Sequence, residues 1–449
     1  MEYRRRDTIA ALATPPGSGA IAIVRLSGPR ARTIASELTG IDPQPRYAHL
    51  CTFRDEHGQR IDQGLLLWFP APRSYTGEDV VELHGHGGRV VSDWLLARVL
   101  ELGASAAQPG EFTLRAFLND KIDLIQAEAV ADLVDSGSQL AARAALRSLD
   151  GQFSTSVQAL QTQLTQLRVQ IEAWLDFPDE ELAFDAAEQS ERLIQALLDE
   201  LAGLAAAARQ GTVLRDGLCV VIAGPPNAGK SSLMNRLAGY DAAIVTDIPG
   251  TTRDPLREHL TLDGLPISII DTAGLRESTD RVEQEGLRRA QTELKRADRV
   301  LWVVDVREPL DPAIAAARAE IGPATPFTLI RNKVDLTDDR AAATELGDVS
   351  TIRLSALTGA GLDLLKSHLL TLAGWTGEVT GTFSARRRHL DAIGRAQRHL
   401  CAARAELDGA LELVAEELRG AQTALSELTG ELTSDDLLGE IFATFCIGK

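Results

Sequence analysis

The sequence predicts a multidomain protein that combines an α+β N-terminal domain, an α-helical central domain and an inserted doubly wound α/β domain. Its 449 residues are too many for one hydrophobic core. The sequence also changes character along its length, from short β-rich runs to helical sequence and then to apolar runs alternating with helical stretches. Because helical sequence returns after Gly377, we expect a helical domain interrupted by an insertion whose two ends lie close together.

The N-terminal and helical parts are predicted from different periodicities. The runs AIAIVRLSG, GLLLWFP and DVVELHGHGG, separated by Pro and Gly turns, predict strands. Further on, apolar residues from Leu160 to Trp174 follow the i, i+4, i+7 spacing of one helix face, and Phe177-Pro178 ends that helix. Helical spacing resumes in HLDAIGRAQRHLCAARAEL and LELVAEELRGAQTALSELTG.

The inserted part is predicted from continuous apolar runs. LCVVIAG, ISIIDTAG, RVLWVVD and FTLIRNKVD alternate with helical stretches, as buried parallel strands do in doubly wound folds. The predicted domain ranges are 1–118 for the N-terminal domain, 119–215 and 377–449 for the two parts of the helical domain, and 216–376 for the insertion.

Composition excludes several classes of protein. With 44% hydrophobic and 24% charged residues, the chain is ordinary for a globular protein, and its apolar runs are too short to cross a bilayer. Four cysteines lie far apart without a C-x-x-C pair, which fits a reducing cytoplasm and excludes a cysteine-only zinc site. The sequence therefore predicts a cytoplasmic location. At a net charge of −18, binding to nucleic acid needs a basic partner or a local basic patch.

The strongest motif is GPPNAGKS, Gly224 to Ser231, which follows the apolar run LCVVIA. This is the G-x-x-x-x-G-K-[ST] pattern of a phosphate-binding loop, in which backbone N–H groups surround the phosphates. Lys230 is placed to reach the β- and γ-phosphates, and the Ser231 hydroxyl to bind Mg²⁺.

Three further motifs predict specificity for GTP. DTAG ends the strand ISII, where Asp271 is placed near the metal and Gly274 near the γ-phosphate. NKVD ends FTLIR, and its Asp335 carboxylate can accept from the N1–H and 2-amino donors of guanine, which adenine lacks. Ser355-Ala356 is expected to close over the base. Together the motifs predict a Ras-like α/β P-loop GTPase domain.

Two features depart from a Ras-like site. Leu275 follows DTAG where Ras-like proteins carry a water-positioning glutamine, and no arginine finger is evident. DIPGTTRD contains two threonines, Thr251 and Thr252, although one suffices for Mg²⁺. The second threonine either has a function of its own or is a β-favouring loop residue.

Motifs spread over nearly the whole chain resemble the MnmE (TrmE) family of tRNA-modifying GTPases. They are ATPPGSGAIAIVRLSG, TGEDVVELHGHGG, PGEFTLRAFLNDKIDLIQAEAVADL, GPPNAGKSSL, TDIPGTTRD, DTAGLRES, NKVD and the terminal FCIGK. The resemblance implies a folate-binding and dimerising N-terminal domain similar to aminomethyltransferases, a split helical domain and an inserted G domain. It also implies a homodimer whose G domains pair in a potassium-dependent way.

The resemblance further implies a reaction and a partner. Members act with the FAD protein MnmG, as two subunits of each, to modify C5 of wobble uridine in certain tRNAs. The product carries a carboxymethylaminomethyl or aminomethyl group, and the one-carbon unit comes from 5-formyl- or methylene-tetrahydrofolate. The alternative class of protein is a GTP-switched ribosome-assembly factor without chemistry of its own.

The resemblance assigns ions to the nucleotide site. It implies K⁺ in the place where an arginine finger would act. Pro249 would stiffen the potassium loop but keep its carbonyls available. The implied K⁺ ligands are Asn227, Thr246, Ile248 (through its carbonyl) and Thr251, and the implied Mg²⁺ ligands are Ser231 and Thr252. The expected nucleotide-site residues are Asn227, Ala228, Gly229, Lys230, Ser231, Ser232, Thr246, Asp247, Ile248, Pro249, Gly250, Thr251, Thr252, Asp271, Thr272, Ala273, Gly274, Asn332, Lys333, Val334, Asp335, Ser355 and Ala356.

The resemblance also assigns Glu283, in STDRVEQEG, the catalytic role of the missing glutamine. Without the resemblance, Glu283 would be interpreted as a solvated carboxylate on a helix face.

A folate site is implied at Arg25, Glu82, Lys121 and Lys449. Glu82 could accept from the donor pair of a pterin ring, and the cations could meet carboxylates or carbonyl oxygens. The alternative for Arg25, Glu82 and Lys121 is a surface ion pair. The two histidines of HGHGG have no third ligand in sequence and are a weak metal signal.

The terminal FCIGK has three interpretations: a poor C-a-a-X prenylation box, a frayed end, or a segment that reaches the folate-dependent site. We expect the third, with Phe442 and Phe445 holding the tail on the helical domain and Thr433 or Ser434 capping the preceding helix. Cys446 is either a small buried apolar residue or a catalytic nucleophile that attacks uridine C6.

The basic run Arg386-Arg387-Arg388 either faces tRNA or MnmG or forms a solvated surface, and we expect the solvated surface.

Overall fold

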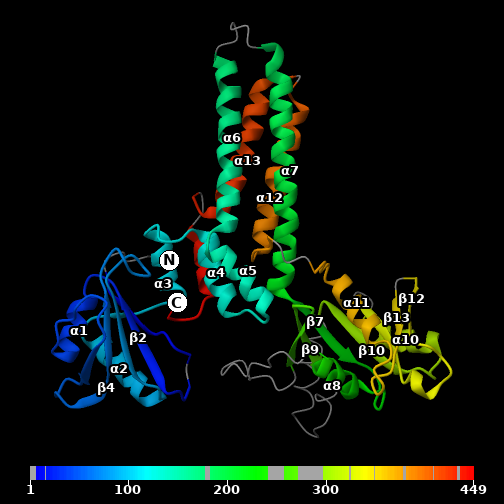
Figure 1. Cartoon of the computed structure of the whole chain (residues 1–449), viewed down its shortest axis with the longest axis horizontal. Helices are drawn as coiled ribbons and strands as arrows, with labels where there is room; N and C mark the ends of the chain where they lie inside the picture. The colour runs from blue at the N-terminus through cyan, green and yellow to red at the C-terminus, as the bar shows by residue number, and fades with distance from the viewer. Residues whose placement is uncertain are drawn as a thin grey trace.

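The computed structural model describes residues 7–15, 17–176, 183–240, 257–271, 297–322, 325–347, 349–377, 381–407, 409–431 and 435–448. Figure 1 shows an N-terminal domain and an α/β domain at the two sides of an upright bundle of long helices. This arrangement confirms the predicted combination of an α+β domain, a helical domain and an α/β insertion. None of the helices in the described ranges is long and apolar enough to cross a membrane.

The N-terminal domain is built on a sheet with the strand order β3-β4-β5-β2-β1-β6. Its strands are antiparallel except for the parallel pair β1–β6. Buried and exposed residues alternate along β2, because one face of the sheet packs against α1 and α2. The elements are β1 (Ile9–Leu12), β2 (Ile21–Ser27), α1 (Ala31–Thr39), β3 (His49–Arg54), β4 (Arg60–Phe69), β5 (Val80–His86), α2 (Arg89–Glu101) and β6 (Ser105–Ala106).

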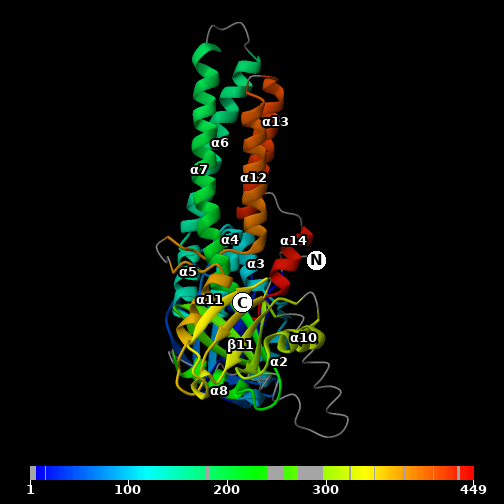
Figure 2. The ribbon, with the colours of Figure 1, turned by 90° about the vertical axis from the view of Figure 1, so that its right-hand side faces the viewer.

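The helical domain combines segments from both sides of the insertion. In Figures 1 and 2, α6 and α7 stand beside α12 and α13, and Leu160, Leu164, Leu167 and Ile171 are buried between them. The shorter helices α3, α4, α5 and α14 gather at the foot of this bundle. The elements are α4 (Leu124–Val134), α5 (Gln139–Leu149), α6 (Gln152–Asp176), α7 (Ala183–Asp216), α12 (Arg387–Ala405), α13 (Leu411–Thr429) and α14 (Asp435–Ala443). Helix α3 (Glu111–Leu118) precedes them in the chain and packs against α4.

The insertion leaves the helical domain at the end of α7 and returns just before α12, and these two crossings lie together as predicted. Gln210 donates from Nε2 to the carbonyl of Gly374 at 2.8 Å, and its Oε1 accepts from the backbone N–H of Thr376 at 3.2 Å. The α/β domain is therefore joined to the helical domain by two adjacent connections. The finer division of the chain at 118, 215 and 376 stays a prediction.

The α/β domain has the sheet order β12-β13-β11-β10-β7-β9-β8. The predicted parallel strands form its centre, but β8 and β12 pair antiparallel at the two edges. Both edge strands are partly polar, so they lack the continuous apolar run that identifies a central strand. The elements are β7 (Leu218–Ala223), α8 (Lys230–Tyr240), β8 (Arg257–Leu262), β9 (Leu265–Asp271), β10 (Arg299–Asp305), α10 (Leu310–Ile321), β11 (Phe327–Asn332), η2 (Val334–Leu336), β12 (Ala342–Leu346), β13 (Val349–Arg353) and α11 (Leu362–Leu372).

Candidate functional site

The phosphate-binding loop connects the buried strand β7 to the first turn of α8. Gly229 has φ +97, and a Cβ at this position would lie 2.2 Å from Nδ2 of Asn332, so only glycine fits. Lys230 is 9% exposed, and its Nζ donates to the carbonyls of Gly224 at 3.0 Å and Pro225 at 2.8 Å. The loop thus places an ammonium and the N-terminus of a helix at one point, which suits an anionic phosphate.

Asn332 joins the NKVD motif to the phosphate-binding loop. Its Nδ2 donates to the carbonyl of Ala228 at 2.9 Å, and its Oδ1 accepts from the backbone N–H of Ala356 at 2.9 Å. Lys333 donates from Nζ to the carbonyl of Asn227 at 2.7 Å. The structure therefore brings three of the sequence motifs into one hydrogen-bonded unit.

Asp335 is the exposed carboxylate of this unit. It lies in the short helix η2, and its Oδ1 accepts from the fully buried Ser355 hydroxyl. Ser355 Oγ also accepts from the backbone N–H of Thr358 at 3.1 Å, which fixes the loop beside it. The hydrogen bond from Ser355 thereby orients the carboxylate, while Asp335 remains exposed to solvent. An exposed and oriented carboxylate suits recognition of a guanine edge.

Asp305 belongs to the same unit and was missed from the sequence. Its Oδ2 lies 3.1 Å from Nζ of Lys333 and 2.7 Å from Nη2 of Arg307. The hydrogen bond from Arg307, together with Lys333, holds the pKa of Asp305 below its usual range. The sequence did contain a signal for Asp305, because it ends the apolar run RVLWVVD as Asn332 ends FTLIRN. The two runs form the parallel neighbours β10 and β11, in which Asp305 lies opposite Asn332 at the carboxyl ends.

The other expected nucleotide and ion residues lie in the first turn of α8, at the end of β9 or outside the described ranges. Asp271 ends β9, but its side chain is outside the described residues. Ser231 and Ser232 are exposed in the first turn of α8. The expected residues that lie wholly outside the described ranges are Thr246, Asp247, Ile248, Pro249, Gly250, Thr251, Thr252, Thr272, Ala273, Gly274 and Glu283.

Arg25 and Glu82 meet because β2 and β5 pair in the register that puts them directly opposite each other. Glu82 Oε1 accepts from Arg25 Nε at 3.0 Å and from Nη2 at 2.8 Å. Their side chains are 24% and 17% exposed, so this is a half-buried pair rather than a surface one. The guanidinium also lies over the rings of Tyr75 and Phe112, at 5.8 Å and 5.9 Å from their centroids.

The other candidates of this domain are placed differently. Lys121 is exposed, and its Nζ donates to the carbonyl of Pro72 at 3.1 Å. His84 lies 3.2 Å from Glu82, and His86 lies 2.8 Å from Asp62. No cluster of three or more metal-binding side chains occurs within the part of the chain that the structure describes.

The C-terminal segment from Thr444 to Gly448, which we call the tail, runs from α14 to the Arg25–Glu82 pair. Phe442 and Phe445 are buried against α4, as predicted. The carbonyl of Gly448 lies 3.5 Å from Nη1 of Arg25. Gly448 has φ +98, and a Cβ there would lie 2.4 Å from the carbonyl oxygen of Leu12, so the position requires glycine.

Cys446 is exposed, so the interpretation of this residue as a small buried apolar side chain is wrong. Its backbone carbonyl accepts from the N–H of Gly110 at 3.3 Å, which positions the residue through the main chain and leaves the thiol accessible. Lys449 and the capping candidates Thr433 and Ser434 lie outside the described residues.

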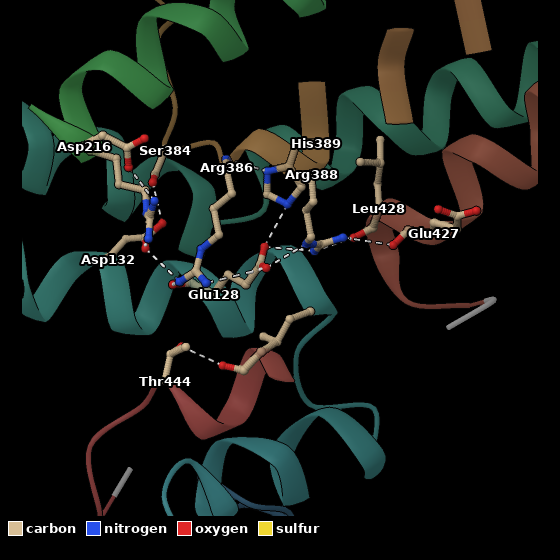
Figure 3. A network of polar contacts seen from close by, with 12 residues as sticks. Glu128, Asp132, Asp216, Ser384, Arg386, Arg388, His389, Glu427, Leu428 and Thr444 are labelled. Atoms are coloured by element: carbon tan, nitrogen blue, oxygen red, sulfur yellow. Dashed lines mark hydrogen bonds and ion pairs between the residues drawn. The ribbon is translucent and has the colours of Figure 1, made fainter. Parts of the chain in front are cut away.

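The expectation that Arg386-Arg387-Arg388 forms a solvated surface is wrong for two of its members. Arg388 donates to the buried Glu128 from Nε at 2.7 Å and from Nη2 at 2.9 Å, and Arg386 lies 2.9 Å from Asp132 (Figure 3). Only Arg387 of the three is exposed. The reason is that Glu128 and Asp132, four residues apart on α4, present two carboxylates to the returning chain.

His389 completes the surroundings of Glu128. The backbone N–H of Arg386 donates to its Nδ1 at 3.0 Å, so Nε2 carries the proton that faces Glu128 at 2.8 Å. Burial alone would raise the pKa of Glu128, but His389 and Arg388 hold it well below its usual range. Glu128 is therefore a carboxylate, and its hydrogen bonds with Arg388 in Figure 3 are charge-assisted.

Comparison with known proteins gives matches along almost the whole chain. Residues 8–121 match the family described as GTP-binding protein TrmE N-terminus, and residues 124–446 match the family described as MnmE helical domain. The chain is 56% identical over 448 residues to the tRNA modification GTPase MnmE of Nitrosococcus oceani, covering 99% of this chain and 98% of that protein. It is also 56% identical over 447 residues to the protein of the same name from Alkalilimnicola ehrlichii, covering 99% and 100%.

Among solved structures, the G domain of the T. maritima FeoB iron transporter is 26% identical, with a TM-score of 0.26, and covers 35% of this chain and 98% of that one. Aquifex aeolicus Era bound to GDP and AlF4⁻ is 23% identical, with a TM-score of 0.27, and covers 41% and 66%.

Proposed function

The chain belongs to the MnmE family of tRNA modification GTPases, and from this premise we propose that it is a potassium-dependent GTPase that modifies wobble uridine together with MnmG. In this proposal C5 of the uridine receives a carboxymethylaminomethyl or aminomethyl group from a folate one-carbon unit. The observation that carries the proposal is the contact of the tail with Arg25, in a chain that also builds a guanine-nucleotide site.

The nucleotide half of the proposal rests on the unit around Asn332. Hydrogen bonds from Asn332 and Lys333 hold the phosphate-binding loop, and Asp335 stands at the other end to accept from guanine. The residues therefore fix base and phosphates relative to each other before the reaction, which is how phosphoryl transfer is catalysed by position.

The loop residues fit the proposed ions. Asn227 has φ +60 and an exposed side chain at the tip of the loop, and Ser231 offers a hydroxyl from the first turn of α8. Amide and hydroxyl oxygens suit K⁺ and Mg²⁺ respectively. A bound K⁺ would supply the positive charge that an arginine finger supplies in other GTPases.

The folate half rests on the half-buried Arg25–Glu82 pair. In this proposal Glu82 accepts from the pterin donors, and Arg25 orients the carboxylate while contacting the tail. Lys121 and Lys449 are the proposed cationic contacts for the rest of the folate. The exposed Cys446 thiol is the proposed nucleophile toward uridine C6.

We also propose the assembly that the family resemblance implies, a homodimer that binds two MnmG subunits. A net charge of −18 favours a basic partner when tRNA is bound, since like charges repel.

Hydrolysis of GTP is expected to need K⁺. K⁺ loses its hydration water more easily than the smaller Na⁺, so amide and carbonyl oxygens of a loop suffice to bind it. The measurement is the GTPase rate of the full chain in KCl and in NaCl at equal ionic strength, with Mg²⁺ constant. Equal rates in the two salts would contradict the potassium site.

Folate binding is expected to depend on Glu82. Glu82→Gln keeps the shape but loses the charge, and a hydrogen bond to a charged group contributes about 1.5–3 kcal/mol, so affinity should fall at least about tenfold. The measurement is titration of the full chain with 5-formyl-tetrahydrofolate by calorimetry. The matched control is Glu101→Gln, an exposed carboxylate paired with Arg98 in the same domain. Absence of folate binding by the wild type would favour a ribosome-assembly GTPase instead.

A further inference from the structure

Helix α4 packs against two different parts of the chain. Leu124 and Ala127 pack against Phe442 and Phe445, which hold the tail. The carboxylates of the same helix, including Asp132, contact the chain that returns from the α/β domain. One element thus contacts both the connections of the α/β domain and the residues that hold the tail, and the capping box at Asp123 fixes its start.

Asp132 holds both connections of the α/β domain at once. Its Oδ1 lies 2.9 Å from Nε of Arg215, at the end of α7 where the chain leaves. The same oxygen lies 2.9 Å from Nη2 of Arg386, and Oδ2 accepts from the Ser384 hydroxyl at 2.6 Å, where the chain returns (Figure 3). The Asp132 side chain is only 6% exposed, so the loss of a donor would leave a buried charge less well paired.

The returning connection is held to the helical domain by further bonds. Ser384 donates from its backbone N–H to the carbonyl of Ala144 at 3.0 Å, and its own carbonyl accepts from Ser148 at 2.9 Å. Arg147 donates to the carbonyl of Thr382 at 2.8 Å. A rotation of the α/β domain therefore acts on the connection at Asp132 rather than on a free linker.

A cavity of about 170 Å³ separates these connections from the tail. Asp132, Arg215, Ser384 and Arg386 line it on one side, and Thr444, the first residue of the tail, lines it on another. Close-packed interiors resist displacement, whereas a void lets neighbouring groups shift. Asp132 and the first residue of the tail therefore line the same cavity.

We propose that Asp132 is a positioning residue that transmits the nucleotide state of the α/β domain through α4 to the tail and its exposed Cys446. Both connections meet one buried carboxylate, and the helix that carries this carboxylate packs on Phe442 and Phe445, which lie just before the tail and within it. The proposal rests on GTP hydrolysis by the chain and extends it to the control of the modification site.

The test measures the reactivity of Cys446 in the full-length protein. Cys401→Ser removes the other exposed thiol. Iodoacetamide labelling of Cys446 is followed by mass spectrometry of the digested protein, with GDP and with GDP plus aluminium fluoride, K⁺ and Mg²⁺. We expect the labelling rates of the two states to differ at least threefold.

Asp132→Asn is expected to make the two labelling rates equal while GTP hydrolysis stays within twofold of the wild type. The matched control is Asp216→Asn, because Asp216 also pairs with Arg215 but is 52% exposed; it should keep the difference. Ser384→Ala removes a single donor to Asp132 and should reduce the difference, which keeps the test valid if Asp132→Asn fails to fold.

Either of two results would overturn the inference: equal labelling rates in the wild type, or an undiminished difference in Asp132→Asn. Both can occur in a protein that hydrolyses GTP and modifies tRNA, so they are distinguishable from a failure of the proposed function. That failure would appear as a wild type without GTPase activity.

Discussion

Deletion of residues 446–449 is expected to abolish tRNA modification and to leave GTP hydrolysis unchanged. The deletion removes the Gly448 carbonyl that lies 3.5 Å from Arg25, together with the exposed Cys446 thiol. It leaves the buried Phe442 and Phe445, so the helical domain keeps its packing. The Asn332 unit lies in a different domain and contains no residue of the tail.

The measurement is a reconstituted assay of the full chain with MnmG, a folate donor, GTP and tRNA, read by mass spectrometry of nucleosides. Ile447→Ala is the control within the tail, because Ile447 is 60% exposed and no role is assigned to its side chain. Cys446→Ser removes the thiol but keeps the contact of the Gly448 carbonyl with Arg25, so it tests the proposed nucleophile separately. Full modification by the truncated protein would show that the tail is only an end of the chain. If the serine variant modifies tRNA fully and the truncated protein does not, Cys446 is not the nucleophile but the tail is still required.

Replacement of Glu283 by alanine is expected to lower kcat for GTP by about 10²-fold or more, or about 3 kcal/mol of barrier. Leu275 cannot position the attacking water, so another polar group has to do so, and Glu283 is the proposed one. Nucleotide affinity should stay near that of the wild type, because the binding unit around Asn332 and Asp335 is intact.

The experiment compares single-turnover hydrolysis and GDP affinity in Glu283→Ala and in the control Glu285→Ala, two residues further along the same segment. The control should hydrolyse GTP at the wild-type rate. Hydrolysis by Glu283→Ala at the wild-type rate would show that Glu283 is a solvated carboxylate without a catalytic role.

Local patterns were sufficient to predict most of the fold. The apolar runs at β7, β9, β10 and β11 are long enough to identify central parallel strands, and the helical spacing around Leu164 identifies α6. The edge strands β8 and β12 were missed because an edge strand is paired on one side only and needs no continuous apolar run.

The polar contacts were less predictable because they depend on tertiary pairing. Arg386 and Arg388 form part of a basic run in sequence, and only the approach of α4 supplies the carboxylates that bury them. Likewise, the contact of Gly448 with Arg25 joins residues 423 positions apart. Asp305 is the exception, since the rule that parallel strands end at one sheet edge would have placed it beside Lys333.

Modification of wobble uridine by this GTPase is tested most directly by nucleoside analysis of tRNA from cells that lack the protein. Total tRNA is digested and its uridine derivatives are separated by mass, with and without a plasmid that encodes the full chain. We expect the carboxymethylaminomethyl and aminomethyl groups at C5 to disappear in the deletion strain and to return with the plasmid. An unchanged set of C5-modified uridines in the deletion strain would contradict this expectation.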